Sequence, residues 1–265
     1  MLEQEKLVFQ RDGVVVIRGL FKDWLDVLEQ GVEANERQPG PWFKDYTPHQ
    51  QQGRFWADYC NWQRIEAFQE FIYKSPAAEV AKAIMGAQQA RIFHEHVLVK
   101  AAASAKATPW HHDAPYYPVD AKQTLSLWIP LDPVARESAI EFIAGSHQWG
   151  QHFRPQSFNG EYYDHGAAKE AILPNIDAAR DDYNIVGWAL EPGDAIAFNY
   201  LTVHGAPGNQ STTHARRAVS FRWLGDDAIY VDRGGKTSPQ YPHLIGVLAS
   251  GDALPEDEFP IIAQN

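Results

Sequence analysis

The sequence predicts a mainly β fold, a sandwich or barrel, packed against an N-terminal layer of helices. Helical periodicity is confined to the first 85 residues, and short strands separated by turns follow from about residue 90. Helices first and many short strands later are typical of a β core covered by helices. No repeat, low-complexity segment or linker is visible in the 265 residues. We therefore expect one domain over residues 1–265, with helices mainly in residues 1–86 and the β core at about residues 88–225.

The N-terminal part is expected to contain four helices and one strand. Residues 2–10 have a helical pattern and lead through the turn Asp12-Gly13 into a buried apolar strand at residues 14–17. Helical periodicity returns in three more segments, the last of which has Pro76 at a helix start: residues 21–34, 63–73 and 76–85. Residues 36–62 are expected to be irregular and are dense in aromatic side chains.

From residue 90 onward, runs of apolar and β-branched residues between turns predict strands. They cover residues 91–100, 124–131, 139–144, 195–203 and 217–224, with a turn at Pro192-Gly193-Asp194 before the fourth. Residues 148–186 form a long, aromatic-rich insertion. Its length predicts a lid or a contact surface.

Composition and charge narrow the class of partner. A chain that is 45% hydrophobic is not disordered, and no apolar run is as long as a membrane span. The net charge of −11 makes nucleic acid and anionic membranes poor partners, so a small molecule is the expected one. A single cysteine, Cys60, and an acidic start without signal-peptide features lead us to expect a cytoplasmic protein. The oligomeric state is not predicted.

Two of the predicted strands have one apolar face and one unusual face. In the last strand the apolar set is Val219, Phe221 and Trp223, and the opposite set is Arg216, Ala218, Ser220 and Arg222. In the strand from residue 124 the apolar set is Leu125, Leu127 and Ile129, and the opposite set is Thr124, Ser126 and Trp128. Such strands belong either to an ordinary surface sheet or to a barrel whose mouth holds a polar ligand.

The combination of His111-His112-Asp113 with a later His204 and Arg216 is the main chemical motif. Two imidazoles and one carboxylate form the facial set that holds non-haem Fe(II) with open coordination positions. A guanidinium further along could bind the carboxylate of an organic co-substrate. A His-x-acid triplet arises readily by chance in a chain with 11 His and 34 acidic residues, so the motif depends on its context.

Over roughly residues 8–225 the chain resembles the phytanoyl-CoA dioxygenase family of Fe(II)- and 2-oxoglutarate-dependent oxygenases. The matching segments are DGVVVIRGLF at 12–21, TPWHHDAPYY at 108–117, LWIPLD at 127–132, GSHQWG at 145–150, PGD at 192–194, His204-Gly205 and Arg216-Arg217. The resemblance implies a double-stranded β-helix, also called a jelly roll and similar to cupins, as the core. In two places the chain departs from the family pattern: the twelve positions from His204 to Arg216 are one more than expected, and Glu137-Ser138 replaces a common Asn-Gly.

The resemblance also implies roles for individual residues. His111, Asp113 and His204 match the iron ligands and are the expected catalytic centre. Arg216 matches the arginine that binds the far carboxylate of 2-oxoglutarate, and Trp128 matches a tryptophan lining that pocket. We expect three further residues to line it: Ser220, His96 and Thr108. Because related halogenases have a small residue in place of the carboxylate, Asp113 implies hydroxylation or a related oxidation.

Several residues have competing interpretations. His94-Glu95-His96 is a rival metal site, but a cupin-type site would need a glutamate where Lys100 stands, and this lysine is expected to be solvated. Arg222 holds an anionic substrate or pairs with a buried carboxylate. Four aromatic residues are expected to wall the substrate pocket, with core packing as the alternative for each: Tyr116, Tyr117, Trp56 and Tyr59.

The expected function is oxidation of a small molecule by Fe(II), 2-oxoglutarate and O2, with release of succinate and CO2. One alternative is a cupin-like metal enzyme that does not use 2-oxoglutarate and therefore does not require Arg216. The other is a non-catalytic jelly-roll binding protein, which has no physical reason to assemble a complete set of metal ligands. The substrate itself is not identified by the sequence.

Overall fold

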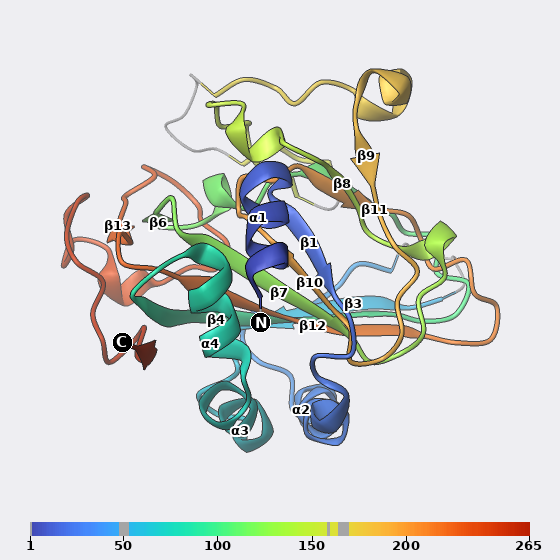
Figure 1. Ribbon diagram of the computed structural model, residues 1–265, viewed down its shortest axis with the longest axis horizontal. Coiled ribbons are helices and arrows are strands. Elements are labelled where there is room, and N and C mark those ends of the chain that lie inside the picture. Colours follow the sequence, from blue (N-terminus) through green and yellow to red (C-terminus); the bar gives the residue numbers. More distant parts are fainter. Residues whose placement is uncertain (1, 48–52, 158–159, 164–169) are drawn as a thin grey trace.

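The structure is a computed structural model that describes residues 2–47, 53–157, 160–163 and 170–265. Its four α-helices all precede residue 86, as predicted: α1 (Glu3–Asp12), α2 (Leu25–Arg37), α3 (Glu66–Lys74) and α4 (Ala77–Met85). A short 3-10 turn, Lys22–Trp24, occupies the start of the helix that was expected from residue 21. The helices α2, α3 and α4 lie on one side of a large sheet (Figure 1). None of the described helices is long and apolar enough to cross a membrane.

The turn between α1 and the first strand depends on glycine. Gly13 ends α1 with a φ of +74°, and its N–H donates to the carbonyl of Phe9. A side chain at this position would also meet the His147 ring at 2.4 Å. The left-handed conformation and the close approach of His147 together require a residue without a Cβ atom.

The large sheet contains eight strands, all paired in the antiparallel sense. Its order is β1 (Val14–Ile17), β10 (Ala195–Phe198), β7 (Thr124–Pro130), β12 (Arg216–Leu224), β4 (Gln89–Lys100), β3 (Phe55–Tyr59) and β2 (Lys44–Asp45). The C-terminal strand β14 (Ile261–Gln264) also pairs with β4. The sheet therefore extends beyond the core that was predicted to end near residue 225.

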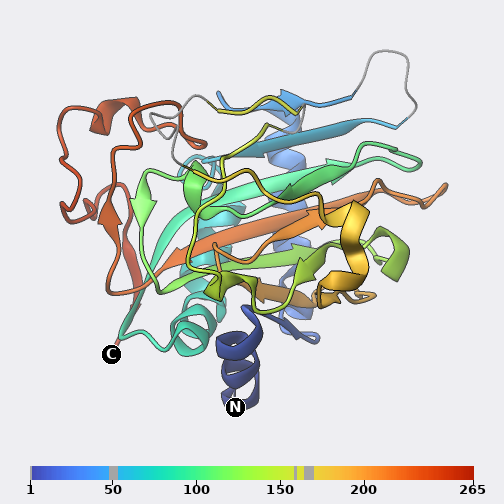
Figure 2. The same cartoon turned by 90° about the horizontal axis from the view of Figure 1, so that it is seen from above.

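A smaller sheet faces the large one. It has the order β5 (Thr108–His111), β11 (His204–Ala206), β8 (Glu141–Ile143) and β9 (Ile185–Val186), and a separate pair joins β6 (Val119–Asp120) to β13 (Ile229–Tyr230). From β4 to β12 the longer strands alternate between the two sheets along the chain (Figure 2). This arrangement is the double-stranded β-helix, and the predicted fold class is confirmed.

The two strands with contrasting faces separate the helical core from a cavity between the sheets. Val219, Phe221 and Trp223 of β12 pack against the helices, and Phe221 stacks on Phe71 of α3 with ring centroids 4.5 Å apart. The opposite face of β12 lines the cavity through Arg216, Ser220 and Arg222. Of the two interpretations of this strand, the structure shows the one in which it divides a core from a polar cavity.

Several strand predictions were incomplete. The segment 36–62 is not wholly irregular, because it contains β2 and β3; β3 is buried on both faces, which hides the alternation of a half-buried strand. The strand expected at 195–203 ends at Phe198. Neither β5, which contains Pro109, nor the three-residue β11 has a pattern long enough to be recognised.

Candidate metal centre

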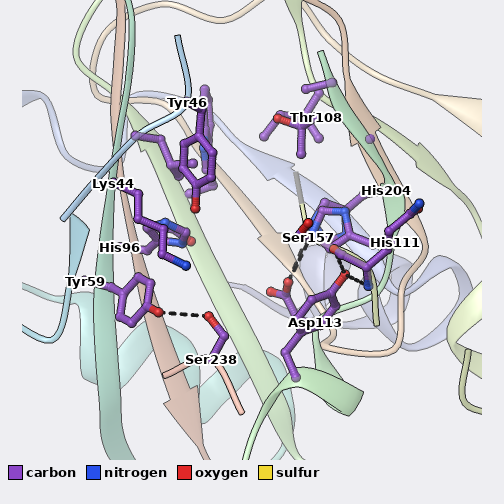
Figure 3. A pocket seen from close by; sticks show the side chains of 18 of the residues that line it. Lys44, Tyr46, Tyr59, His96, Thr108, His111, Asp113, Ser157, His204 and Ser238 are labelled. Carbon is purple, nitrogen blue, oxygen red and sulfur yellow. Dashed lines mark hydrogen bonds and ion pairs between the residues drawn. The ribbon is translucent and has the colours of Figure 1, made fainter. Parts of the chain in front are cut away.

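Three side chains of the smaller sheet converge on one point. His111 ends β5, His204 begins β11, and the pairing of these strands sets the two residues directly opposite each other. Asp113 follows two residues after His111, at the start of a 3-10 turn. Its Oδ1 atom lies 3.6 Å from His111 Nε2 and 3.9 Å from His204 Nε2 (Figure 3). Adjacent strands therefore bring together residues that are far apart in the sequence.

Backbone carbonyls orient both imidazoles. His111 Nδ1 lies 2.8 Å from the Pro109 carbonyl oxygen, and His204 Nδ1 lies 2.9 Å from that of Thr202. Because a carbonyl only accepts, each Nδ1 carries the proton and each Nε2 presents a lone pair. One ligand atom from each of His111, Asp113 and His204 lies within 4.8 Å of the others, and no other such group of three occurs among the described residues. This donor set suits Fe(II) with open positions.

Asp113 is held from its other side by Arg222. The carboxylate is 4% exposed, and its Oδ2 atom lies 3.4 Å from Arg222 Nη2. Burial by itself would raise the pKa of the Asp113 carboxyl. The combined effect of Arg222 and the two histidines is larger and opposite, so the pKa lies well below its usual range. Arg222 also donates from Nε to the Tyr117 hydroxyl. Of the two interpretations of Arg222, the structure shows the buried ion pair.

The rival pair His94 and His96 lines the same cavity but lacks a third ligand. Glu95 points away from it and accepts hydrogen bonds from the backbone of Asn61 and Trp62 at 2.8 and 2.9 Å. The Nε2 atoms of both histidines are buried and have no hydrogen-bond partner among the described residues. Burial lowers the pKa of each imidazole well below its usual value, so both are neutral. They are therefore suited to accept or donate hydrogen bonds within the cavity.

The cavity has a volume of about 480 Å³ and lies between the two sheets. It contains the metal centre and every residue that was predicted to bind the co-substrate: Arg216, Trp128, Ser220, His96 and Thr108. These residues come from β12, β7, β4 and β5, so both sheets contribute. The strand pairings thus bring the proposed iron ligands and co-substrate residues into one chamber.

Two buried cations share one end of this cavity. Lys100 is 2% exposed and lies 3.2 Å from both Thr108 Oγ1 and the Pro207 carbonyl, and its Nζ lies 4.7 Å from the centroid of the Phe55 ring. Arg216 is 7% exposed and donates to the carbonyls of Ser138 and Pro207. The described residues include no acidic group within 4.0 Å of either cation.

The expectation that Lys100 is solvated was therefore wrong. Its position on the same strand face as His94 and His96 was the signal that it points into the cavity. Burial, and then the charge of Arg216, lower the pKa of Lys100 to about 6, and burial lowers that of Arg216 to about 10. Buried charges are costly without a partner, so this end of the cavity suits an anion such as a dicarboxylate.

The predicted substrate residues divide into two groups. Tyr59, Tyr116, Tyr117 and Arg222 line the cavity. Trp56 does not, because it lies three positions before Tyr59 in β3 and so points to the opposite face. It is 1% exposed and packs in the helical core, with its ring centroid 5.5 Å from that of Phe43. The prediction that Trp56 lines the substrate pocket is therefore wrong, and Trp56 is a core residue.

Part of the insertion forms another wall of the cavity. Its contribution comes from Gln156, Ser157, Glu161, Tyr162 and Tyr163. The hydroxyl of Tyr116 bonds to both the carbonyl and the N–H of Gln156, at 2.7 and 2.8 Å, and so attaches this segment to the site. Sequence reasoning missed the individual lining residues from loops and from the short edge strand, among them Lys44, Tyr46, Lys236 and Ser238. No periodic pattern marks residues of that kind.

The family model described as phytanoyl-CoA dioxygenase matches residues 9–218 of the chain. No curated protein matches it significantly. Among solved structures, the chain is similar to the non-haem α-ketoglutarate-dependent carbocyclase SnoK from nogalamycin biosynthesis, with a TM-score of 0.75 and 20% identity over 99% of this chain and 97% of the other.

Two further solved structures contain bound ligands. The epimerase SnoN in complex with Fe3+, α-ketoglutarate and nogalamycin RO has a TM-score of 0.73 and 22% identity, over 99% of this chain and 98% of the other. EctD from S. alaskensis with 2-oxoglutarate and 5-hydroxyectoine has a TM-score of 0.70 and 15% identity, over 96% of this chain and 85% of the other. At these identities the likeness establishes the fold alone.

Proposed function

The chain belongs to the phytanoyl-CoA dioxygenase family of Fe(II)- and 2-oxoglutarate-dependent oxygenases, and within that family we propose that it hydroxylates a small organic substrate. The observation that carries the proposal is one cavity holding both a His-Asp-His donor set and two buried basic side chains, Lys100 and Arg216, without a described acidic partner. The first suits iron and the second suits a dicarboxylate. When bound, iron and 2-oxoglutarate would supply the oxidising power, so that the substrate, O2 and 2-oxoglutarate become the hydroxylated substrate, succinate and CO2.

The proposed iron ligands are His111 Nε2, His204 Nε2 and Asp113 Oδ1. The carbonyls of Pro109 and Thr202 hold the two imidazoles in the correct tautomer. Arg222 occupies the second oxygen of Asp113 and so favours binding through one oxygen only. These three side chains would together hold the ion at the wall of the cavity.

Arg216 and Lys100 are the proposed binding site for the distal carboxylate of 2-oxoglutarate. The planar guanidinium provides paired donors and Lys100 adds a point charge. Thr108, 3.2 Å from Lys100, holds the ammonium group in place. Trp128, Ser220 and His96 line the same cavity. The Ser220 hydroxyl is buried without a described partner and is available to the co-substrate.

Hydroxylation or a related oxidation is proposed over halogenation because Asp113 retains the carboxylate ligand. SnoK and SnoN, which share the fold, are a carbocyclase and an epimerase, so the family fold accommodates several oxidations. We also propose that residues 1–265 act as one unit, since β14 completes the large sheet beside β4.

The test is succinate release by purified protein supplied with Fe(II), 2-oxoglutarate and O2, with and without candidate substrates. We expect slow succinate formation without substrate, faster formation with it, and a product heavier by one oxygen atom. The His204→Ala variant should form neither succinate nor the oxidised product. Metal-dependent turnover of a substrate in the absence of 2-oxoglutarate would instead favour the cupin-like alternative.

A further inference from the structure

The cavity is also lined by two lysines that form no ion pair with any acidic residue that the structure describes. Lys44 belongs to β2 at the edge of the large sheet, and Lys236 belongs to the segment after β13. Both line the cavity. Neither makes an ion pair or a hydrogen bond with any residue that the structure describes. The Nζ atom of Lys236 lies over the Tyr163 ring, 5.4 Å from its centroid.

Lys44 faces the metal centre across the cavity. Figure 3 shows its side chain extending into the space between the large sheet and the His111, Asp113 and His204 group. The side chain is only partly exposed, and burial followed by the charge of Lys236 lowers the pKa of Lys44. A lysine that only kept the surface soluble would extend into water, whereas this one is partly desolvated beside a second cation.

The charges that line the cavity differ in sign from the chain as a whole. Among the residues that the structure describes, the lining contains five basic side chains, Lys44, Lys100, Arg216, Arg222 and Lys236, and two carboxylates, Asp113 and Glu161. The whole chain has 34 acidic and 23 basic residues. Cations gathered in a partly enclosed space produce a positive potential that attracts anions.

The proposed function accounts for only part of this positive charge. Arg222 is paired with Asp113, and the 2-oxoglutarate carboxylate would neutralise the charge at Arg216 and Lys100. The iron ion adds two positive charges, and 2-oxoglutarate brings two negative ones. Among the described residues, Lys44 and Lys236 form no ion pair, either with Glu161 or with any other acidic group.

We propose that Lys44 and Lys236 bind an anionic group of the organic substrate, so that this oxygenase acts on an anion whose charge lies across the cavity from the metal. This inference rests on the proposed function and names the substrate class of the same site. Tyr46, Tyr59 and Tyr163 line the cavity near these lysines and suit a flat or ring-shaped body. His96, with its buried Nε2 atom, offers a hydrogen bond beside the anion.

The test compares two probes of the same shape, 1-naphthoate and 1-naphthamide, which differ in charge. Binding to protein loaded with Mn(II) and saturating 2-oxoglutarate is measured by calorimetry without O2, so that Arg216 and Lys100 are already occupied. We expect the carboxylate to bind about tenfold more tightly than the amide, with a preference that shrinks as NaCl is added. Lys44→Gln should reduce the preference to threefold or less and leave amide binding unchanged.

Two controls separate charge from damage to the fold. Lys44→Arg retains the charge and should retain the preference, and Lys122→Gln removes an exposed lysine outside the cavity and should change nothing. Equal binding of the two probes, no binding of 1-naphthoate at millimolar concentration, or an unchanged preference in Lys44→Gln would each overturn the inference. Binding of 2-oxoglutarate to the Mn(II) protein is measured first, and its absence would count against the proposed function instead.

Discussion

The guanidinium of Arg222 lies 3.4 Å from the carboxylate of Asp113, measured from Nη2 to Oδ2, while Oδ1 of the same carboxylate faces His111 and His204. Arg222 of the large sheet therefore orients Asp113, the proposed iron ligand in the turn that follows β5. Arg222 has no place among the ligands, yet it determines which oxygen of Asp113 is available to the metal.

Replacing Arg222 should weaken metal binding although Arg222 touches no metal. We expect Arg222→Gln to lower the affinity for Fe(II) by about 10- to 100-fold, because the orientation of Asp113 is lost. Arg222→Lys should recover part of this affinity. Anaerobic Fe(II) titration measures the effect, and an affinity equal to that of the wild type would show that Asp113 needs no such support.

Loss of a histidine ligand should abolish turnover and leave the fold intact. His111→Ala and His204→Ala are expected to release no succinate and to unfold near the wild-type temperature, because the strands that carry them remain paired. Asp113→Ala is a poorer choice, since it leaves Arg222 buried without its partner. His94→Ala is the matched control: if it lost all activity while His111→Ala kept it, the metal centre would lie at the other histidine pair.

Neighbouring arginines in β12 should have different effects. Arg216→Ala is expected to weaken 2-oxoglutarate binding by about 2–4 kcal/mol, because a desolvated charged pair is lost. Arg217 points away from the cavity and binds Asp132 and Glu29, each at 2.8 Å. Arg217→Ala should therefore lower the unfolding temperature and leave 2-oxoglutarate binding unchanged. Similar losses of co-substrate affinity in the two variants would contradict the assigned faces of the strand.

The affinity for 2-oxoglutarate should fall as pH rises above about 6. The pKa of Lys100 is about 6 in the ligand-free cavity, and a bound carboxylate raises it, so binding takes up a proton. Below this pKa the lysine is already charged and the affinity levels off. Above it, each binding event must protonate Lys100, which costs up to about tenfold in affinity per pH unit.

Calorimetry in buffers of different ionisation enthalpy counts the proton directly. Lys100→Met should bind 2-oxoglutarate more weakly and without proton uptake between pH 6 and pH 8. A wild-type affinity that is constant over this range would exclude Lys100 from the co-substrate site.

Substitutions at residues that line the substrate side of the cavity should lower succinate release in the presence of substrate more than succinate release in its absence. Tyr116→Phe removes the hydroxyl that holds Gln156, so we expect substrate-stimulated succinate release to fall while the slow release without substrate persists. Trp56→Ala is the contrasting variant. Because Trp56 is a core residue, it should lose about 3–5 kcal/mol of stability. Equal loss of both activities in Tyr116→Phe would place this tyrosine in support of the iron site.

Most of the fold could be predicted from the sequence because residue types alternate along a strand according to the surroundings of its two faces. In β12, the alternation of Val219 and Phe221 with Ser220 and Arg222 reflects a helical core on one side and a cavity on the other. The strand β3 could not be predicted from the sequence, because its residues are buried on both faces. Without the strand, nothing showed which face Trp56 occupies, and its placement in the pocket was wrong. The residue type alone does not show whether an aromatic side chain packs in the core or lines the substrate pocket.

From the sequence by itself came the proposed ligand set and the proposed co-substrate arginine, through the family resemblance. The division of β12 and β7 into two faces also came from the sequence, because alternation depends only on spacing within one strand. Only the tertiary structure decided the partners across elements. It joined Arg222 to Asp113, buried Lys100 beside Arg216, and brought Lys44 and Lys236 to one cavity. Such contacts depend on which strands pair and how the loops close over them, and local periodicity carries no information about distances between segments that are remote along the chain.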